Sequence, residues 1–165
     1  MTIHSRRAAL ALMLAVPLAA CGAGGDDRTA ELATRSAQSM PSLYPGETPQ
    51  MRQLVETYAE VHDIPPALLH RVIQRESDYN PRAFNGAGPY YGLMQILPAT
   101  ARSMGFSGPA ERLFDAETNL EYAGRYLRGA WLVSGGDIDR AVMWYARGYY
   151  YEAKRLGLLE ETGLR

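Results

Sequence analysis

The chain has almost no cysteine, since Cys21 is the only one in 165 residues. A disulfide between two cysteines of the same chain is therefore excluded. The chain also has almost no net charge, because 17 basic and 18 acidic side chains give a formal net charge of −1. Proteins that bind nucleic acid through bulk electrostatics have a clear basic excess, so no nucleic-acid partner is expected.

Patterns for metal and phosphate binding are missing as well. The three histidines, His4, His62 and His70, form no ligand cluster, so no metal is expected. There is no glycine-rich phosphate loop with its lysine, and we expect no cofactor. No stretch alternates between apolar and polar residues for long enough to predict a strand. The length leaves room for one domain, and 10 % aromatic residues are enough for a packed core.

One long apolar run lies close to the N-terminus. Arg6 and Arg7 precede the apolar segment 8–20, which has the length of a signal-peptide core and is too short to span a bilayer comfortably. The run ends in Leu-Ala-Ala-Cys21, which resembles the lipobox of bacterial lipoproteins. In that family the chain is cut before the cysteine, which then carries the lipid. An ordinary secretory signal with a chance cysteine is the alternative.

The resemblance to lipoproteins implies a division of the chain into three parts. Residues 1–20 are expected to be a lipoprotein signal peptide. Residues 21–48 are expected to be a flexible tether, because small residues and proline dominate and no periodicity is sustained. Gly22 does not resemble an inner-membrane retention signal, which favours lipid anchoring to the outer membrane, facing the periplasm. Residues 49–165 then form the folded domain.

The domain is expected to be all-α. Apolar residues recur at helical spacing, and caps, prolines and glycines mark where helices begin and end. We predict an irregular assembly of about five to seven helices rather than a regular bundle. The glycine-rich stretch 82–92 is expected to be a loop. The predicted helices begin at Thr48–Pro49, run through 64–77, span about 98–104, run from Asp115 to Gly135, and begin again at Asp137.

Glu76 lies on the wrong face of the second predicted helix. Leu69, Val72 and Ile73 form an apolar stripe, whereas His70 belongs to the polar face. Glu76 comes three residues after Ile73 and four after Val72, so its carboxylate shares the apolar stripe. Burial disfavours the charged form and raises the pKa of a carboxyl, as a general acid requires. The alternative is a buried structural glutamate that pairs with an arginine or caps backbone amides.

Three blocks around Glu76 resemble the catalytic domain of lytic transglycosylases of the soluble type (SLT), which has a lysozyme-like superfold. They are ESxYNPxA over 76–83, GLMQIxPxTA over 92–101 and LxDxxxNLxxAGxYL over 113–127, in the family's order. The resemblance implies an enzyme that acts on the glycan strands of peptidoglycan. Such an enzyme cleaves the β-1,4 bond between N-acetylmuramic acid and N-acetylglucosamine and leaves a 1,6-anhydromuramyl end.

The same resemblance implies roles for individual residues. Glu76 would be the single catalytic group, acting first as acid and then as base. Ordinary glycosidases need a second carboxylate across the sugar. Of the other acidic residues, Asp115 is a better helix cap than a catalytic group, and Glu117 and Glu121 are expected on a solvated face. Asn119 is expected to be structural. The substrate-binding residues implied by the motifs are Ser77, Asn85, Tyr91, Met94, Gln95 and Tyr145.

One family motif is altered in this chain. Where the family often has Y-N-x-G, the chain has Tyr145-Ala146-Arg147-Gly148, so the asparagine is missing. Two alternatives to a lytic transglycosylase therefore stay open. The first is a hydrolytic muramidase of the goose-lysozyme kind, which needs a positioned water and usually a helper carboxylate. The second is a peptidoglycan-binding protein without catalysis.

Overall fold

The computed structural model describes residues 42–164. The predicted signal peptide 1–20, the predicted lipidated Cys21 and the tether up to residue 41 lie outside these residues. Within the described range, no helix is both long enough and apolar enough to cross a membrane.

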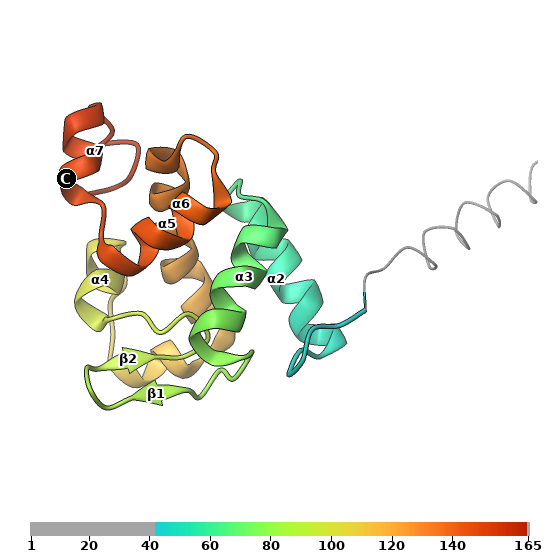
Figure 1. Ribbon diagram of the computed structural model, residues 1–165. Coiled ribbons are helices and arrows are strands. Elements are labelled where there is room, and N and C mark those ends of the chain that lie inside the picture. Colours follow the sequence, from blue (N-terminus) through green and yellow to red (C-terminus); the bar gives the residue numbers. More distant parts are fainter. Residues whose placement is uncertain (1–41, 165) are drawn as a thin grey trace, which may run out of the picture. The chain divides into compact units, whose positions relative to one another are not determined.

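Helices make up nearly all the regular structure, which confirms the predicted all-α class (Figure 1). The β1–β2 hairpin lies at the end of α3, on the opposite side of the view in Figure 1 from α7. The helices are α2 (Pro49–Val61), α3 (Pro66–Ser77), α4 (Pro98–Ser103), α5 (Ala116–Ser134), α6 (Ile138–Arg147) and α7 (Tyr150–Leu156), with a 3₁₀ helix over Ala110–Phe114, and the strands are β1 (Phe84–Asn85) and β2 (Tyr90–Tyr91).

Local sequence signals set most helix ends. The Thr48 hydroxyl accepts a hydrogen bond from the Met51 N–H at 3.1 Å, at the start of α2. Asp115 and Asp137 cap α5 and α6 in the same way. Gly135 ends α5 in the left-handed conformation, with φ of 65°. These predicted caps and stops are confirmed, because each depends on residues within one turn of the helix end.

Helix α5 is the centre of the domain. It packs against α2, α4, α6, α7 and the 3₁₀ helix, and its buried face includes Leu120 and Leu127. Gly129 lets the chain after α6 approach closely: a Cβ at this position would lie 2.1 Å from the Tyr149 hydroxyl oxygen. That hydroxyl donates to the Tyr126 carbonyl at 2.7 Å. The buried Tyr149 thus fastens the start of α7 onto α5.

Three small elements differ from the sequence prediction, namely the β1–β2 hairpin, the 3₁₀ helix and α7. The stretch 82–92, predicted as a loop, contains an antiparallel hairpin in which Phe84 pairs with Tyr91 and Asn85 with Tyr90. Strands of two residues are too short to show an alternating pattern, so sequence periodicity cannot reveal them. Helix α7 was not predicted either. Ala153 is its one buried residue within the helix, and one residue makes no apolar stripe.

The prediction that His70 lies on a polar face is wrong. Its side chain is buried, because residues 42–48 lie over it, whereas the sequence predicts these residues to belong to the tether. We call residues 42–48 the amino-terminal strap. The Tyr44 ring lies 5.1 Å from the His70 ring between centroids. A hydrogen bond of 2.7 Å joins His70 Nδ1 and the Tyr79 hydroxyl, and Glu47 Oε1 lies 3.5 Å from the same nitrogen. Burial lowers the pKa of His70, which favours the neutral imidazole.

A buried ion pair holds the strap to α2. Arg52 donates from Nε to Glu47 Oε1 at 2.7 Å and from Nη2 to Oε2. The Tyr44 N–H also donates to the Glu47 carboxylate, at 2.9 Å. Burial opposes ionisation of Glu47, but the bonds from Arg52 and Tyr44 prevail and lower its pKa. The strap is therefore fixed by a charged, fully bonded carboxylate.

We expect the domain to lose stability as the pH falls below about 6.5. Burial lowers the pKa of both His62 and His70 from the ordinary value of 6.5. Below pH 6.5 the histidines of the unfolded chain bind protons, whereas those of the folded domain do not. The folded domain therefore loses stability as the pH falls from 6.5 to the folded-state pKa values. The midpoint temperature of thermal unfolding should decrease as the pH is lowered from about 7.5 to about 5.

The variant His70→Asn provides a control for this pH dependence. Its side-chain amide can accept from or donate to the Tyr79 hydroxyl, but one titrating group is gone. The fall in the unfolding midpoint should therefore be smaller than in the wild type. A midpoint that does not change over this pH range would contradict the prediction.

Candidate active site

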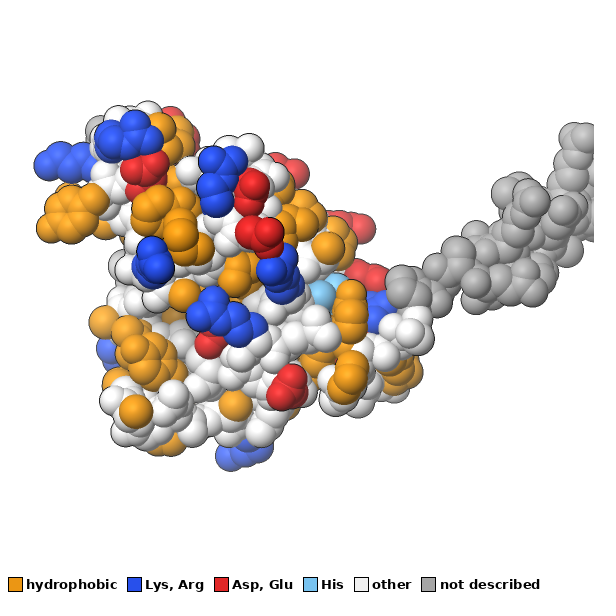
Figure 2. Space-filling view, viewed as in Figure 1, with side chains coloured by type: hydrophobic (Ala, Val, Ile, Leu, Met, Phe, Trp, Pro, Cys, Tyr) orange, Lys and Arg blue, Asp and Glu red, His pale blue; other side chains and the backbone are white. Residues whose placement is uncertain are grey.

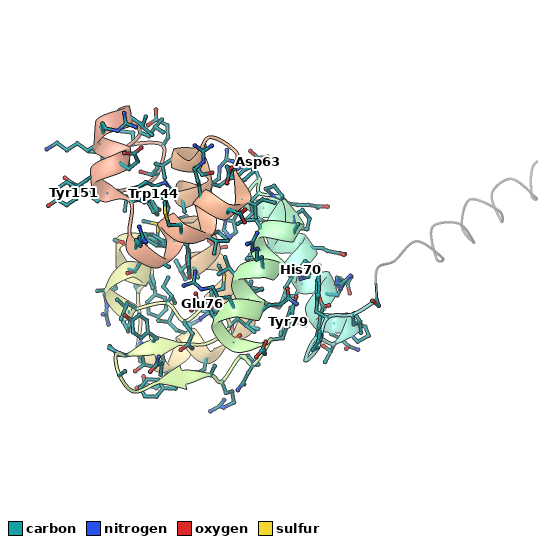
Figure 3. All side chains as sticks on the ribbon, viewed as in Figure 1. Asp63, His70, Glu76, Tyr79, Trp144 and Tyr151 are labelled. Atoms are coloured by element: carbon teal, nitrogen blue, oxygen red, sulfur yellow. The ribbon has the colours of Figure 1, made fainter. Side chains whose placement is uncertain are left out.

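Glu76 lies on the last turn of α3, on the side of the helix away from His70 and Tyr79 (Figure 3). Val72 and Ile73, one turn before it, have no exposed surface. The Glu76 side chain itself is 22 % exposed. The predicted position on the apolar face is thus confirmed. The carboxyl is half-buried at the edge of the core, where it can still reach a bound ligand.

The surroundings of Glu76 favour its protonated form. Burial raises the pKa of Glu76, and Arg75 opposes this rise only weakly, because its Nε lies 3.6 Å from Oε1 and its side chain is half exposed. Within residues 42–164, no donor forms a hydrogen bond with the Glu76 carboxyl. A structural glutamate would have such bonds. The group therefore suits proton donation better than structural pairing.

A cavity of about 460 Å³ opens in front of Glu76. We call it the catalytic pocket. Its walls come from α3, from the β1–β2 hairpin, from the turn after β2 and from α6. Four predicted site residues meet there, and Glu76 is the one carboxylate among the lining residues, which are Arg75, Glu76, Asn85, Tyr90, Gln95, Tyr145 and Ala146.

Asn119 holds the turn that follows β2. Its side-chain oxygen accepts from the Met94 N–H at 3.0 Å, and its NH₂ donates to the Tyr91 and Leu113 carbonyls, each at 2.8 Å. Gly92 has φ of 72°, and a Cβ there would lie 2.3 Å from the Leu113 oxygen. The glycine of the GLMQ block thus allows close packing, and Asn119 has the structural role that the sequence predicts.

Gln95 is held in an unusual backbone conformation. Its φ is 47°, in the left-handed region that few residues other than glycine adopt. Its side-chain NH₂ donates to the Ala83 and Gly92 carbonyls, both at 3.0 Å. We expected Gln95 to offer a donor and an acceptor to substrate. Because both amide hydrogens are used, only the amide oxygen is left, and it acts as an acceptor.

Tyr145 both lines the pocket and supports it. Its hydroxyl donates to the Met94 carbonyl at 2.9 Å, which ties α6 to the turn that carries Gln95. Burial, and then the nearby Glu76 charge, raise the pKa of Tyr145 well above its ordinary value. The hydroxyl therefore stays protonated and remains a donor at any working pH.

Three predicted site residues do not line the catalytic pocket. The Met94 side chain is fully buried, so only its backbone contributes, through the bond with Tyr145. The Ser77 hydroxyl donates to the Leu93 carbonyl at 2.7 Å and makes no bond with Glu76. Tyr91 packs against Phe84 and Phe114. These three residues support the segments that form the pocket wall.

Three residues of the pocket wall, Arg75, Tyr90 and Ala146, are not among the predicted site residues. Tyr90 takes the place expected for Tyr91, because neighbouring residues of a strand point to opposite sides and the sequence does not fix which one faces the pocket. Arg75 enters the wall beside Glu76. Asp115, Glu117 and Glu121 line a separate cavity of about 280 Å³, which Glu76 does not reach. Within the described part of the chain, no cluster of side chains could hold a metal ion.

Comparisons with known proteins agree with this site. Residues 53–157 match the family model of the transglycosylase SLT domain. A transglycosylase of Enterobacteria phage PRD1 is 37 % identical over 87 residues, which is 53 % of this chain but only 31 % of the phage protein. The chain thus spans less than a third of that relative's length. No solved structure matches. The blocks that carry the predicted resemblance fall inside the matched range, and the chain belongs to the transglycosylase SLT domain family.

Proposed function

We propose that the protein is a lytic transglycosylase of peptidoglycan. It would cleave the β-1,4 bond between N-acetylmuramic acid and N-acetylglucosamine and leave 1,6-anhydromuramyl ends. The observation that carries this proposal is the single carboxyl in the catalytic pocket, Glu76, with its raised pKa. Hydrolytic glycosidases place a second carboxyl about 5–9.5 Å from the first. A pocket with one carboxyl suits a reaction in which the sugar supplies its own nucleophile.

The first step is proton donation. Protonated Glu76 gives its proton to the glycosidic oxygen while the bond from that oxygen to the muramyl C1 breaks. The N-acetylglucosamine part leaves as an alcohol, and C1 becomes electron-poor. The Glu76 carboxylate that forms is close to the Arg75 guanidinium, whose Nε lies 3.6 Å from Oε1. This contact stabilises the charge that appears on Glu76 during the step.

The second step regenerates the acid. The Glu76 carboxylate takes the proton from the muramyl C6 hydroxyl, and the C6 oxygen bonds to C1, which closes the 1,6-anhydro ring. No water is consumed, and Glu76 is protonated again at the end. One residue thus performs both proton transfers, so no helper carboxylate is needed in the pocket.

Two amide side chains are placed to orient the sugars. Gln95 has its amide oxygen free to accept an N–H from an acetamido group, because its NH₂ is bound to backbone carbonyls. Asn85 has the opposite arrangement. Its oxygen accepts from the Ala87 N–H at 3.1 Å, which leaves its NH₂ to donate to a sugar oxygen. The pocket thus offers one acceptor and one donor with fixed roles.

Mass spectrometry of the products tests this function. The full chain is incubated with purified peptidoglycan, and the released muropeptides are weighed. Products lighter by one water than hydrolytic products are expected. Hydrated reducing ends would show a muramidase instead. A protein that binds peptidoglycan but releases no product would be a binding protein.

We further propose that the protein is lipid-anchored to the outer membrane and faces the periplasm. The support is the sequence around Cys21, where an apolar run and small residues end at the one cysteine of the chain. Cys21→Ala is expected to move the protein from the membrane fraction to the soluble fraction without loss of activity. Glu76→Gln should do the reverse and stay with the membrane. A Cys21→Ala protein that still sediments with membranes after a high-salt wash would contradict the anchor.

A further inference from the structure

A second cavity continues from the catalytic pocket along the C-terminal end of α6. It has a volume of about 250 Å³, and we call it the side pocket. Tyr90, Gln95, Tyr145 and Ala146 line both cavities, so a ligand that enters one meets the wall of the other. The altered Tyr145-Ala146-Arg147-Gly148 motif thus lies where the two cavities join. Residues that line only the side pocket include Thr100, Tyr126 and Arg147.

Arg147 brings an uncompensated positive charge to the side pocket. Its side chain is exposed in the last turn of α6, and no carboxylate lines this cavity. Within residues 42–164 it makes no ion pair or hydrogen bond. Arg71 and Arg140, by contrast, pair with Asp139 and Asp137. A planar guanidinium with free N–H groups is a good partner for a carboxylate.

Two hydroxyl groups in the side pocket are also available as donors. The hydroxyls of Tyr126 and Thr100 form no hydrogen bond within the described residues. Burial raises the pKa of Tyr126, so its hydroxyl keeps its proton. A guanidinium and two hydroxyls can together bond both oxygens of one carboxylate. A neutral sugar would not need the positive charge.

We propose that the side pocket binds a carboxylate of the peptide attached to a muramyl residue, so that the enzyme prefers peptide-bearing glycan strands. This inference rests on the proposed function. In peptidoglycan the muramyl lactyl group carries a short peptide with free carboxylates. Because the two cavities share four lining residues, we expect the peptide of a muramyl residue bound at Glu76 to extend into the side pocket. Arg147 then stands where a carboxylate of that peptide can reach it.

The charge around the two cavities agrees with an anionic ligand. Arg75 and Arg147 line them, and Glu76 is the one acidic residue in either wall. Figure 2 shows several basic side chains on the face of the domain that carries α3 and α6, some of them beside acidic ones. The two cavities together are therefore lined by more basic than acidic side chains, although the chain as a whole has a net charge of −1. Such a local field draws anionic ligands to the site.

Cleavage of three forms of one substrate shows whether the enzyme recognises the peptide carboxylates or another feature of the strand. The first is a preparation of uncrosslinked, peptide-bearing glycan strands. The second is the same preparation after its carboxylates are amidated with carbodiimide and ammonia. The third has its peptides removed by an amidase, which leaves only the lactyl carboxylate on each muramyl residue. The full chain is assayed on all three, and kcat/KM is compared with that of Arg147→Gln and Arg102→Gln.

Arg102 is a matched control, because it lies in the last turn of α4 as Arg147 lies in that of α6, but lines neither cavity. Wild type and Arg102→Gln should prefer the peptide-bearing strands over both other forms by about tenfold, as expected for one charge-assisted hydrogen bond. In Arg147→Gln the preference should fall to about one. The preference should also weaken at high salt.

Several outcomes would overturn the proposal. Equal wild-type cleavage of peptide-bearing and amidated strands would show that no carboxylate is recognised. Equal cleavage of peptide-bearing and stripped strands would point to the lactyl group instead of the peptide. An Arg147→Gln enzyme that keeps the wild-type preference would remove Arg147 from the site. Cleavage of none of the three forms by wild type would overturn the proposed function, and this inference with it.

Discussion

Glu76→Gln is expected to lower kcat by about 10³-fold or more, because the proposed mechanism uses Glu76 as both acid and base. Glutamine has the same shape but cannot donate a proton to the glycosidic oxygen or take one from the C6 hydroxyl. The measurement is the rate of anhydromuropeptide release from purified peptidoglycan. Because Glu76 is the one carboxyl that lines the catalytic pocket, no neighbour can take over.

The fold of Glu76→Gln should be unchanged. Burial raises the pKa of Glu76, so its ionised form destabilises the folded state at neutral pH, and a neutral amide removes that cost. Its unfolding midpoint should therefore equal or exceed that of the wild type at neutral pH. Glu117→Gln is the matched control, since Glu117 lines the separate cavity, and it should keep wild-type activity. If Glu76→Gln kept a tenth of the activity or more, the acid would have to be another residue.

Asn119→Ala is expected to destabilise the domain by about 3 kcal/mol or more, because buried groups that lose a hydrogen bond each cost about 1–3 kcal/mol. Asn119 has no exposed surface and bonds three backbone groups, the Met94 N–H and the carbonyls of Tyr91 and Leu113. Alanine would leave all three without a partner. Urea denaturation at neutral pH measures the change in the free energy of unfolding.

Activity should fall together with stability in Asn119→Ala. Gln95 follows Met94 directly, so a loosened turn moves the Gln95 amide oxygen that we propose as an acceptor for the substrate. The control is Asn80→Ala, which removes a single hydrogen bond, from the Arg82 N–H, at an exposed position. The control should change the free energy of unfolding by less than about 1 kcal/mol. Equal effects of the two substitutions would show that Asn119 does not hold the turn.

Features that depend on near neighbours in the chain were predictable from the sequence. The caps at Thr48, Asp115 and Asp137 each bond an N–H within one helical turn. The place of Glu76 on the apolar face follows from its spacing to Val72 and Ile73 in the same helix. Such features need no knowledge of what the rest of the chain does, and the structure confirms them.

Features that depend on distant segments were not predictable in the same way. His70 looks polar within α3, but the strap covers it from more than twenty positions earlier in the chain. The donor role expected for Gln95 is lost to the Ala83 carbonyl, a partner across the hairpin. Whether Tyr90 or Tyr91 lines the pocket depends on the register of the two-residue strands, and strands this short have no periodicity in the sequence. Each of these outcomes is decided by tertiary contacts.

If the protein is anchored at Cys21 as we propose, the amino-terminal strap limits how far the domain can lie from the membrane. Because Glu47 is bound to Arg52 and Tyr44 stacks beside Tyr79, the connection from Cys21 ends at residue 42 rather than at the start of α2. At up to ~3.6 Å per extended residue, this shortens the maximum reach by about 25 Å. Glycan layers beyond that distance would be out of range. Glu47→Ala would free the strap and let the same domain work deeper in the wall.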